Sequence, residues 1–109
     1  MFIVSGNDIQ LTRGDTARLN VEITNTLNNN IYQLNEDDEL ILTVKKNTTR
    51  KESLIQKKSA SGDFYFAPED TAELPYSKYV YDVQLTTHSG DVYTVIEPSV
   101  FEVMPEVTF

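Results

Sequence analysis

The sequence contains no cysteine and only one histidine, His88. Without thiols the chain can form no disulfide and offers neither a thiolate metal ligand nor a cysteine nucleophile. A single histidine excludes a histidine-rich zinc site and argues against a hydrolytic triad. No apolar run approaches the roughly 20 residues that a helix needs to cross a bilayer, so we expect no membrane association. These absences exclude several chemistries but do not indicate what the protein does.

The length and the first residues set further expectations. A chain of 109 residues has the size of one ordinary domain, so we expect a single domain over residues 1–109. The segment Met1–Ser5 lacks the basic and long apolar regions of a signal peptide. We therefore expect no secretory signal peptide.

Alanine is scarce, with four residues, whereas valine, isoleucine, threonine, phenylalanine and tyrosine supply 40 of 109. These residue types favour strands. Apolar and polar residues also alternate with a period of two, which is typical of strands with one buried face. The alternating runs are Ile9–Leu11, Ala17–Ile23, Leu40–Val44, Phe64–Phe66, Tyr79–Leu85 and Phe101–Val103.

Short segments with glycine separate these runs. They are Arg13-Gly14-Asp15, Ser61-Gly62-Asp63 and Ser89-Gly90-Asp91. Glycine supplies the positive φ of tight hairpins. Asn25–Asn30 is expected to be a polar loop, and Pro68–Ala72 one helical turn, since proline and acids favour the start of a helix. The pattern predicts an all-β fold, an immunoglobulin-like antiparallel β-sandwich of seven to eight short strands.

The net charge of −8 is unevenly distributed along the chain. Residues 45–58 carry six basic residues and one acid, whereas the remainder carries three basic residues and sixteen acids. One reading is a solvated loop whose lysines keep a strand edge from aggregating. The other is charge complementarity, by which copies dock on one another or on a larger assembly.

We take the second reading as the source of a candidate protein interface. Its residues are Lys45, Lys46, Arg50, Lys51, Lys57 and Lys58. Nucleic-acid binding is a poorer use of them, because the acidic remainder repels phosphate and no aromatic residue lies between Lys45 and Lys58.

Other patterns favour structural roles. Glu36–Glu39 has four carboxylates but lacks the ligand spacing of a calcium loop, so a solvated turn is expected. Arg13-Gly14-Asp15 matches the tripeptide of integrin ligands, yet a turn explains it. Asn47-Thr48-Thr49 fits a glycosylation sequon. His88 is expected in an exposed turn. No phosphate loop, nucleotide motif or serine elbow is present, and we expect no enzyme, no metal and no cofactor.

The tyrosines divide into two groups by strand alternation. Tyr79 and Tyr81 share a face with Val83, which predicts core packing. Tyr65 and Tyr93 fall at positions that can point outward, where tyrosine supplies contact area at low entropic cost. Even for these two, core or edge packing is the favoured interpretation.

The order of segments resembles a family of small structural proteins encoded among the virion genes of tailed phages and prophages of Firmicutes. More distantly, it is similar to the amino-terminal sandwich of baseplate upper proteins. The segments that carry the resemblance are Ile9–Thr16, Leu40–Lys46, Pro68–Thr71, Tyr79–Leu85, Gly90–Ile96 and Phe101–Val103.

The resemblance implies a non-enzymatic virion component of a tail, baseplate, fibre or head, and it transfers no catalytic residue. Its expected partners are other virion proteins or copies of itself, so it would be oligomeric when assembled. Its expected location is the virion, after synthesis in the bacterial cytoplasm. The alternative is a host-surface recognition module that binds a glycan or a cell-wall protein through the loops Asn25–Asn30 and Ser89–Tyr93.

Overall fold

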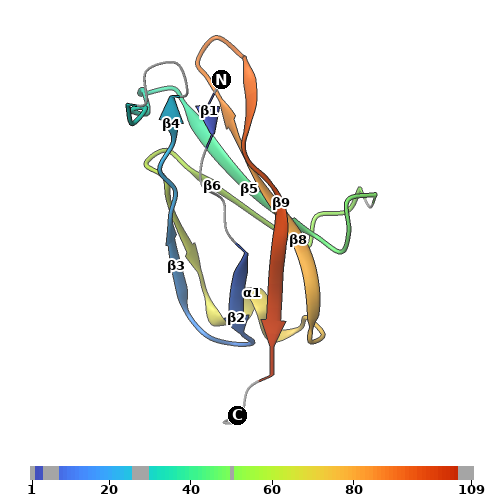
Figure 1. Ribbon diagram of the computed structural model, residues 1–109. Coiled ribbons are helices and arrows are strands. Elements are labelled where there is room, and N and C mark those ends of the chain that lie inside the picture. Colours follow the sequence, from blue (N-terminus) through green and yellow to red (C-terminus); the bar gives the residue numbers. More distant parts are fainter. Residues whose placement is uncertain (1, 4–7, 26–29, 50, 106–109) are drawn as a thin grey trace.

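A computed structural model describes residues 2–3, 8–25, 30–49 and 51–105 (Figure 1). The protein is mainly β, as the composition predicts. The strands are β1 (Phe2–Ile3), β2 (Ile9–Thr12), β3 (Ala17–Asn20), β4 (Thr24–Asn25), β5 (Glu39–Lys45), β6 (Ile55–Ser59), β7 (Asp63–Phe66), β8 (Ser77–Thr86) and β9 (Val92–Met104). Among the described residues there is one helix, α1 (Pro68–Ala72), where the sequence predicts a helical turn.

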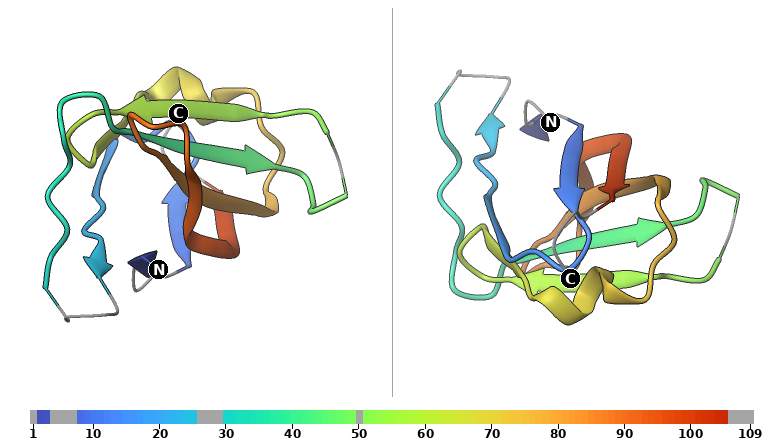
Figure 2. Two further views of the ribbon diagram at one scale, coloured as in Figure 1. Left: turned by 90° about the horizontal axis from the view of Figure 1, so that it is seen from above. Right: turned by 90° about the horizontal axis from the view of Figure 1, so that it is seen from below.

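Seven of these strands form two sheets, which agrees with the expected number. One is a curled sheet of five strands in the order β2-β9-β8-β5-β6, and the other pairs β3 with β7 (Figures 1 and 2). A further short pair joins β1 to β4.

The expectation of a purely antiparallel arrangement is wrong, because β2 runs parallel to β9. Ile9 lies beside Phe101 and Thr12 beside Met104. The two strands are far apart in the chain, so no tight turn fixes their relative direction, and the alternation within each strand cannot reveal it. In the described part of the chain the result is a mixed sheet with a small second sheet, which is not a clear immunoglobulin sandwich.

The alternation in β5 and β8 builds the core. Leu40, Leu42 and Val44 on β5 are fully buried, and they lie beside Leu85, Val83 and Tyr81 on β8. The intervening residues of both strands face the outside of the five-stranded sheet. One face of this sheet is therefore apolar and packed, and the other is mostly polar, with Ile41 and Val80 as apolar exceptions.

β9 is one strand of 13 residues, whereas the sequence indicates two shorter ones. Its register against β8 shifts between Tyr81 and Gln84, so that Ser99 lies beside Tyr81 and Ile96 beside Val83. Pro98 falls in this irregular stretch, where a missing N–H interrupts no regular ladder. The bulge bends the strand, and its second half pairs with both β8 and β2.

Three glycines with positive φ occupy the predicted turns, at Gly14, Gly62 and Gly90. Only Ser89-Gly90-Asp91 closes a hairpin, between β8 and β9. The other two turns carry the chain from the five-stranded sheet to β3 or β7 of the small sheet, so the hairpins expected there are wrong. A glycine turn reverses the chain but does not decide which strands pair.

The two sheets meet at Phe101, which is fully buried on β9. Its ring centroid lies 5.6 Å from that of Phe66 on β7 and 6.3 Å from that of Tyr81 on β8. Tyr79 and Tyr81 are buried, which confirms the predicted core packing. The helix α1 joins this core through Thr71, whose fully buried hydroxyl accepts a hydrogen bond from the Gly14 N–H at 2.8 Å.

Candidate interaction surfaces

The five described basic residues of the predicted interface lie along the β5–β6 hairpin, but they do not form one group. Lys45 ends β5, and Lys46 and Lys51 are exposed in the connection between the strands. Lys58 is exposed on β6, at the edge of the five-stranded sheet. Arg50 lies outside the described residues. The connection protrudes from the body, on the side away from β4 (Figure 2).

Lys57 is turned toward the body of the protein. Its Nζ lies 2.8 Å from Oδ2 of Asp70 on α1, and both side chains are largely shielded from solvent. The Asp70 carboxylate also accepts a hydrogen bond from the Ala67 N–H at 2.7 Å, just before the helix. Lys57 thus ties the edge strand to α1, and this leaves Lys46, Lys51 and Lys58 as the exposed lysines of the predicted set.

Lys45 lines a hollow on the outer face of the five-stranded sheet, with a volume of about 200 Å³. We call it the outer-face hollow. Thr43 and Asp82 lie side by side across β5 and β8, with Gln84 further along β8. Thr48 and Pro98 line it from the β5–β6 connection and the β9 bulge. Burial raises the pKa of Asp82, and the nearby Lys45 opposes this only in part. Alternation predicts that Asp82 faces outward, but it does not predict the β9 bulge that helps to enclose it.

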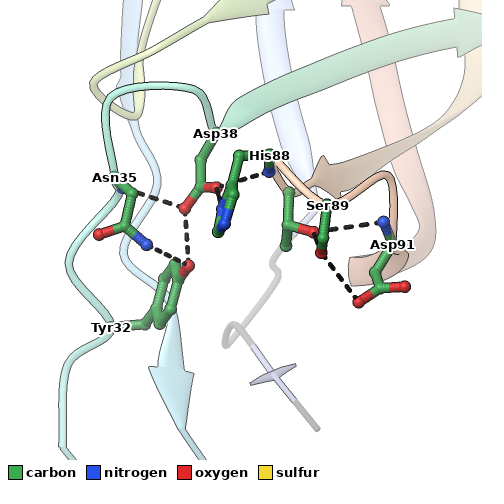
Figure 3. Close-up of polar contacts among 7 residues, drawn as sticks. Tyr32, Asn35, Asp38, His88, Ser89 and Asp91 are labelled. Atoms are coloured by element: carbon green, nitrogen blue, oxygen red, sulfur yellow. Dashed lines mark hydrogen bonds and ion pairs between the residues drawn. The ribbon is translucent and has the colours of Figure 1, made fainter.

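A second polar group surrounds Asp38, just before β5 (Figure 3). Its carboxylate is buried and accepts hydrogen bonds from the Tyr32 hydroxyl at 2.6 Å, the Asn35 N–H at 3.0 Å and the His88 N–H at 3.2 Å. Burial raises the pKa of Asp38, but these hydrogen bonds outweigh it and hold the pKa below its usual value. The same carboxylate raises the pKa of Tyr32.

This arrangement corrects the expectation of a solvated acidic turn over Glu36–Glu39. Glu36 and Asp37 are exposed as expected, whereas Asp38 is buried and holds two loops together. No signal in the sequence distinguishes Asp38 from its acidic neighbours, because its donors come from Tyr32 and from the distant β8–β9 turn. His88 itself is exposed, as predicted, and its Nδ1 lies 3.9 Å from the Asp38 carboxylate.

Because Asp38 fastens the β8–β9 turn, it also brings together acids from two parts of the chain. Asp91 is exposed in that turn, where its N–H donates to the Thr87 hydroxyl. Glu39 lies beside Thr86, the last residue of β8. We call the resulting group the acidic end of the sheet: Glu36, Asp37, Glu39 and Asp91.

The Arg13-Gly14-Asp15 segment is a turn, as interpreted from the sequence, and its arginine packs on the body. The Arg13 guanidinium lies 4.2 Å from the centroid of the Tyr76 ring, and its Nη2 donates to the Tyr76 hydroxyl at 2.8 Å. The Asp15 N–H donates to the Thr12 carbonyl at 3.0 Å, which closes the turn. These contacts give the tripeptide a structural role.

Tyr65 and Tyr93 are exposed, so the outward orientation that the alternation allows is confirmed. Of the favoured interpretation, core or edge packing, packing in the core is wrong for both, and packing at a sheet edge stays a prediction. The Arg18 guanidinium lies 5.3 Å from the Tyr65 ring centroid on the small sheet. Asn47, in the sequon, accepts hydrogen bonds from the Thr49 N–H and hydroxyl. Of the loop Asn25–Asn30, residues 26–29 lie outside the described residues.

Within the described ranges, no three histidine or acidic side chains converge in a way that could hold a metal ion. Nor does that part of the chain contain a helix long and apolar enough to span a membrane. No protein-family model matches the chain, and no curated protein matches it.

Proposed function

We propose that this protein is a non-enzymatic structural or assembly component of a phage particle, in the tail, baseplate or fibre, and that it acts through protein–protein contacts. The resemblance in segment order supports the phage context. The proposal includes oligomerisation when the particle is assembled. It also includes a distant relationship to immunoglobulin-like sandwiches, a fold in which two β-sheets face each other around a shared core.

The observation that carries the proposal is the protruding β5–β6 hairpin with exposed lysines on an otherwise acidic body. A β-hairpin whose strands belong to a packed sheet presents charge in a fixed position, which favours specific contact over diffuse attraction. β6 is also an edge strand, and edge strands are commonly covered when copies or neighbours assemble.

The direct test is the composition of purified particles from the phage or prophage whose genome carries the gene. An antiserum against this chain should detect it in particles banded on a density gradient, and gold-labelled antibody should decorate the tail or baseplate in electron micrographs. A chain that is abundant in the lysate but absent from complete particles would contradict the proposal.

The outer-face hollow favours one second candidate, recognition of a host glycan. Carboxylate, ammonium, hydroxyl and amide groups converge there beside Val80 and Pro98, a mixture that suits the hydroxyls and the apolar face of a sugar ring. Cell-wall sugars added to the ¹⁵N-labelled protein should then shift the amide resonances around Asp82. The D82N variant should weaken the response, whereas D37N, in an exposed loop, should not. Unchanged spectra at millimolar sugar would reject this candidate.

A further inference from the structure

The two ends of strand β5 carry opposite charge. The strand begins at the acidic end, with Glu39, and ends at Lys45, where the chain enters the β5–β6 connection (Figure 1). We call the two described lysines of this connection, Lys46 and Lys51, the basic tip; both are exposed, and the connection also carries one exposed acid, Glu52. The sequence pattern shows the basic segment but not its position opposite the acids.

The separation between the ends prevents them from neutralising each other within one molecule. Seven residues of strand span about 20 Å, which is more than the Debye length of about 8 Å at physiological ionic strength. β5 is also held between β6 and β8, so it cannot bend to bring its ends together. Each molecule therefore presents two separate and opposite charges.

Apolar side chains lie beside both charged groups. Leu54, in the connection that carries the basic tip, is 41% exposed, and Val92, next to Asp91 at the acidic end, is 56% exposed. An interface usually needs such apolar contact, since exposed ion pairs alone contribute little. The two ends thus offer complementary charge and an apolar residue each.

We infer that copies of this chain dock end to end, with the basic tip of one copy on the acidic end of the β5–β8 sheet of the next. The inference rests on the proposed assembly function and names its partner, a second copy of the same chain. The contact is heterologous, because the two surfaces differ, so it generates a ring or an open stack rather than a closed dimer.

The overall charge restricts the contact to this orientation. At net −8, two copies repel each other when they approach by their acidic surfaces. Lys57 cannot supply an alternative contact, because its ammonium is paired with Asp70. Lys58 is exposed on the edge strand β6, beside Ile41 on β5, which places it nearer to the acidic end than to the basic tip.

The experiment is sedimentation velocity over a concentration series of the wild type at about 0.1 M salt. The expected result is concentration-dependent association that is lost near 1 M salt, where the Debye length falls to about 3 Å. The tip variant K46E/K51E and the end variant E36K/D37K should each associate about tenfold more weakly than the wild type. All four substituted side chains are exposed, and unfolding curves will show whether the variants are folded.

The decisive measurement is the equimolar mixture of the two variants. In that mixture the acidic tip of K46E/K51E can dock on the basic end of E36K/D37K. The native tip of E36K/D37K can dock on the native end of K46E/K51E, so association should return to the wild-type level or above. As a control, R18E reverses one exposed basic residue but lies on β3 of the small sheet, away from the two ends of β5, so it should associate as the wild type does.

A wild type that stays monomeric at millimolar concentration would overturn the inference, as would a mixture that remains monomeric or an R18E variant that associates as weakly as the tip variant. None of these results affects detection of the chain in purified particles, so the proposed function and this inference can fail separately.

Discussion

Asp38 is the side chain on which the packing of two loops depends. Its carboxylate is nearly inaccessible to solvent and accepts three hydrogen bonds, from Tyr32, Asn35 and His88. Replacing Asp38 with alanine leaves these donors without their acceptor, which should lower the free energy of unfolding by about 2–4 kcal/mol. Urea denaturation followed by circular dichroism measures this loss. D37A, at the exposed neighbour, should change stability by less than about 0.5 kcal/mol, and an equal loss in both variants would contradict the assigned role.

Asp82 should make the folded protein less stable at neutral pH than in mild acid. Its pKa is raised by burial, so the folded state binds the proton more tightly than the unfolded state does. The ionised form therefore costs stability above the folded-state pKa, and the cost vanishes below the unfolded value of about 4. D82N should be more stable than the wild type at pH 7, by less than about 1 kcal/mol because the site is partly open to solvent.

The measurement for Asp82 is a series of urea curves between pH 4 and pH 7. The advantage of D82N should shrink as the pH falls through the folded-state pKa. An advantage that is constant over this range would contradict ionisation as its cause. The lowered pKa of Asp38 acts in the other direction, since its contribution is present above about pH 4 and is lost in stronger acid.

At the scale of elements, the turns between strands depend on glycine for two different reasons. Gly62, between β6 and β7, has φ of 94°, and a Cβ added there would lie 2.7 Å from the Val21 carbonyl oxygen. Gly90, in the β8–β9 hairpin, has φ of 91° with nothing within 4 Å of an added Cβ. G90A therefore adds backbone strain alone, whereas G62A adds strain and a clash with backbone.

We expect G90A to lower the free energy of unfolding by about 1 kcal/mol and G62A by at least about 2–3 kcal/mol. Thermal and urea unfolding of the two variants, side by side, measures the difference. Equal losses would mean that the backbone at Val21 shifts at no cost in free energy and that the short distance between Gly62 and the Val21 carbonyl oxygen does not require glycine.

The same elements show what a sequence can predict. Alternation identifies β5 and β8 and their buried residues, because one face of each strand packs on the core. It does not predict the parallel pairing of β2 with β9, since direction depends on segments far apart in the chain. It also misses β6, where Gln56, Lys57 and Lys58 obscure the pattern at a sheet edge. For the candidate site, the charge pattern identifies the basic segment. Only the fold shows that Lys57 is paired with Asp70, whereas Lys46 and Lys51 are exposed.

For the whole molecule, Phe101 is the residue that joins the two sheets. It is fully buried and contacts Phe66 on the small sheet and Tyr81 on the large one. F101A should lower the free energy of unfolding by about 3–5 kcal/mol, a large fraction of the 5–15 kcal/mol typical of a domain. F101L preserves most of the volume and should cost less. Calorimetry measures both, and an F101A variant that melts at the wild-type temperature would contradict this role.

The parallel pairing of β2 with β9 also has a consequence for biosynthesis. Residues 9–12 are made well before residues 101–104, which are their neighbours in the sheet. While the nascent chain emerges from the ribosome, β2 has no strand to pair with until residue 104 has followed. Contacts between such distant segments slow folding, because a long loop must close before they form. We therefore expect the large sheet to be completed only after translation has passed β9.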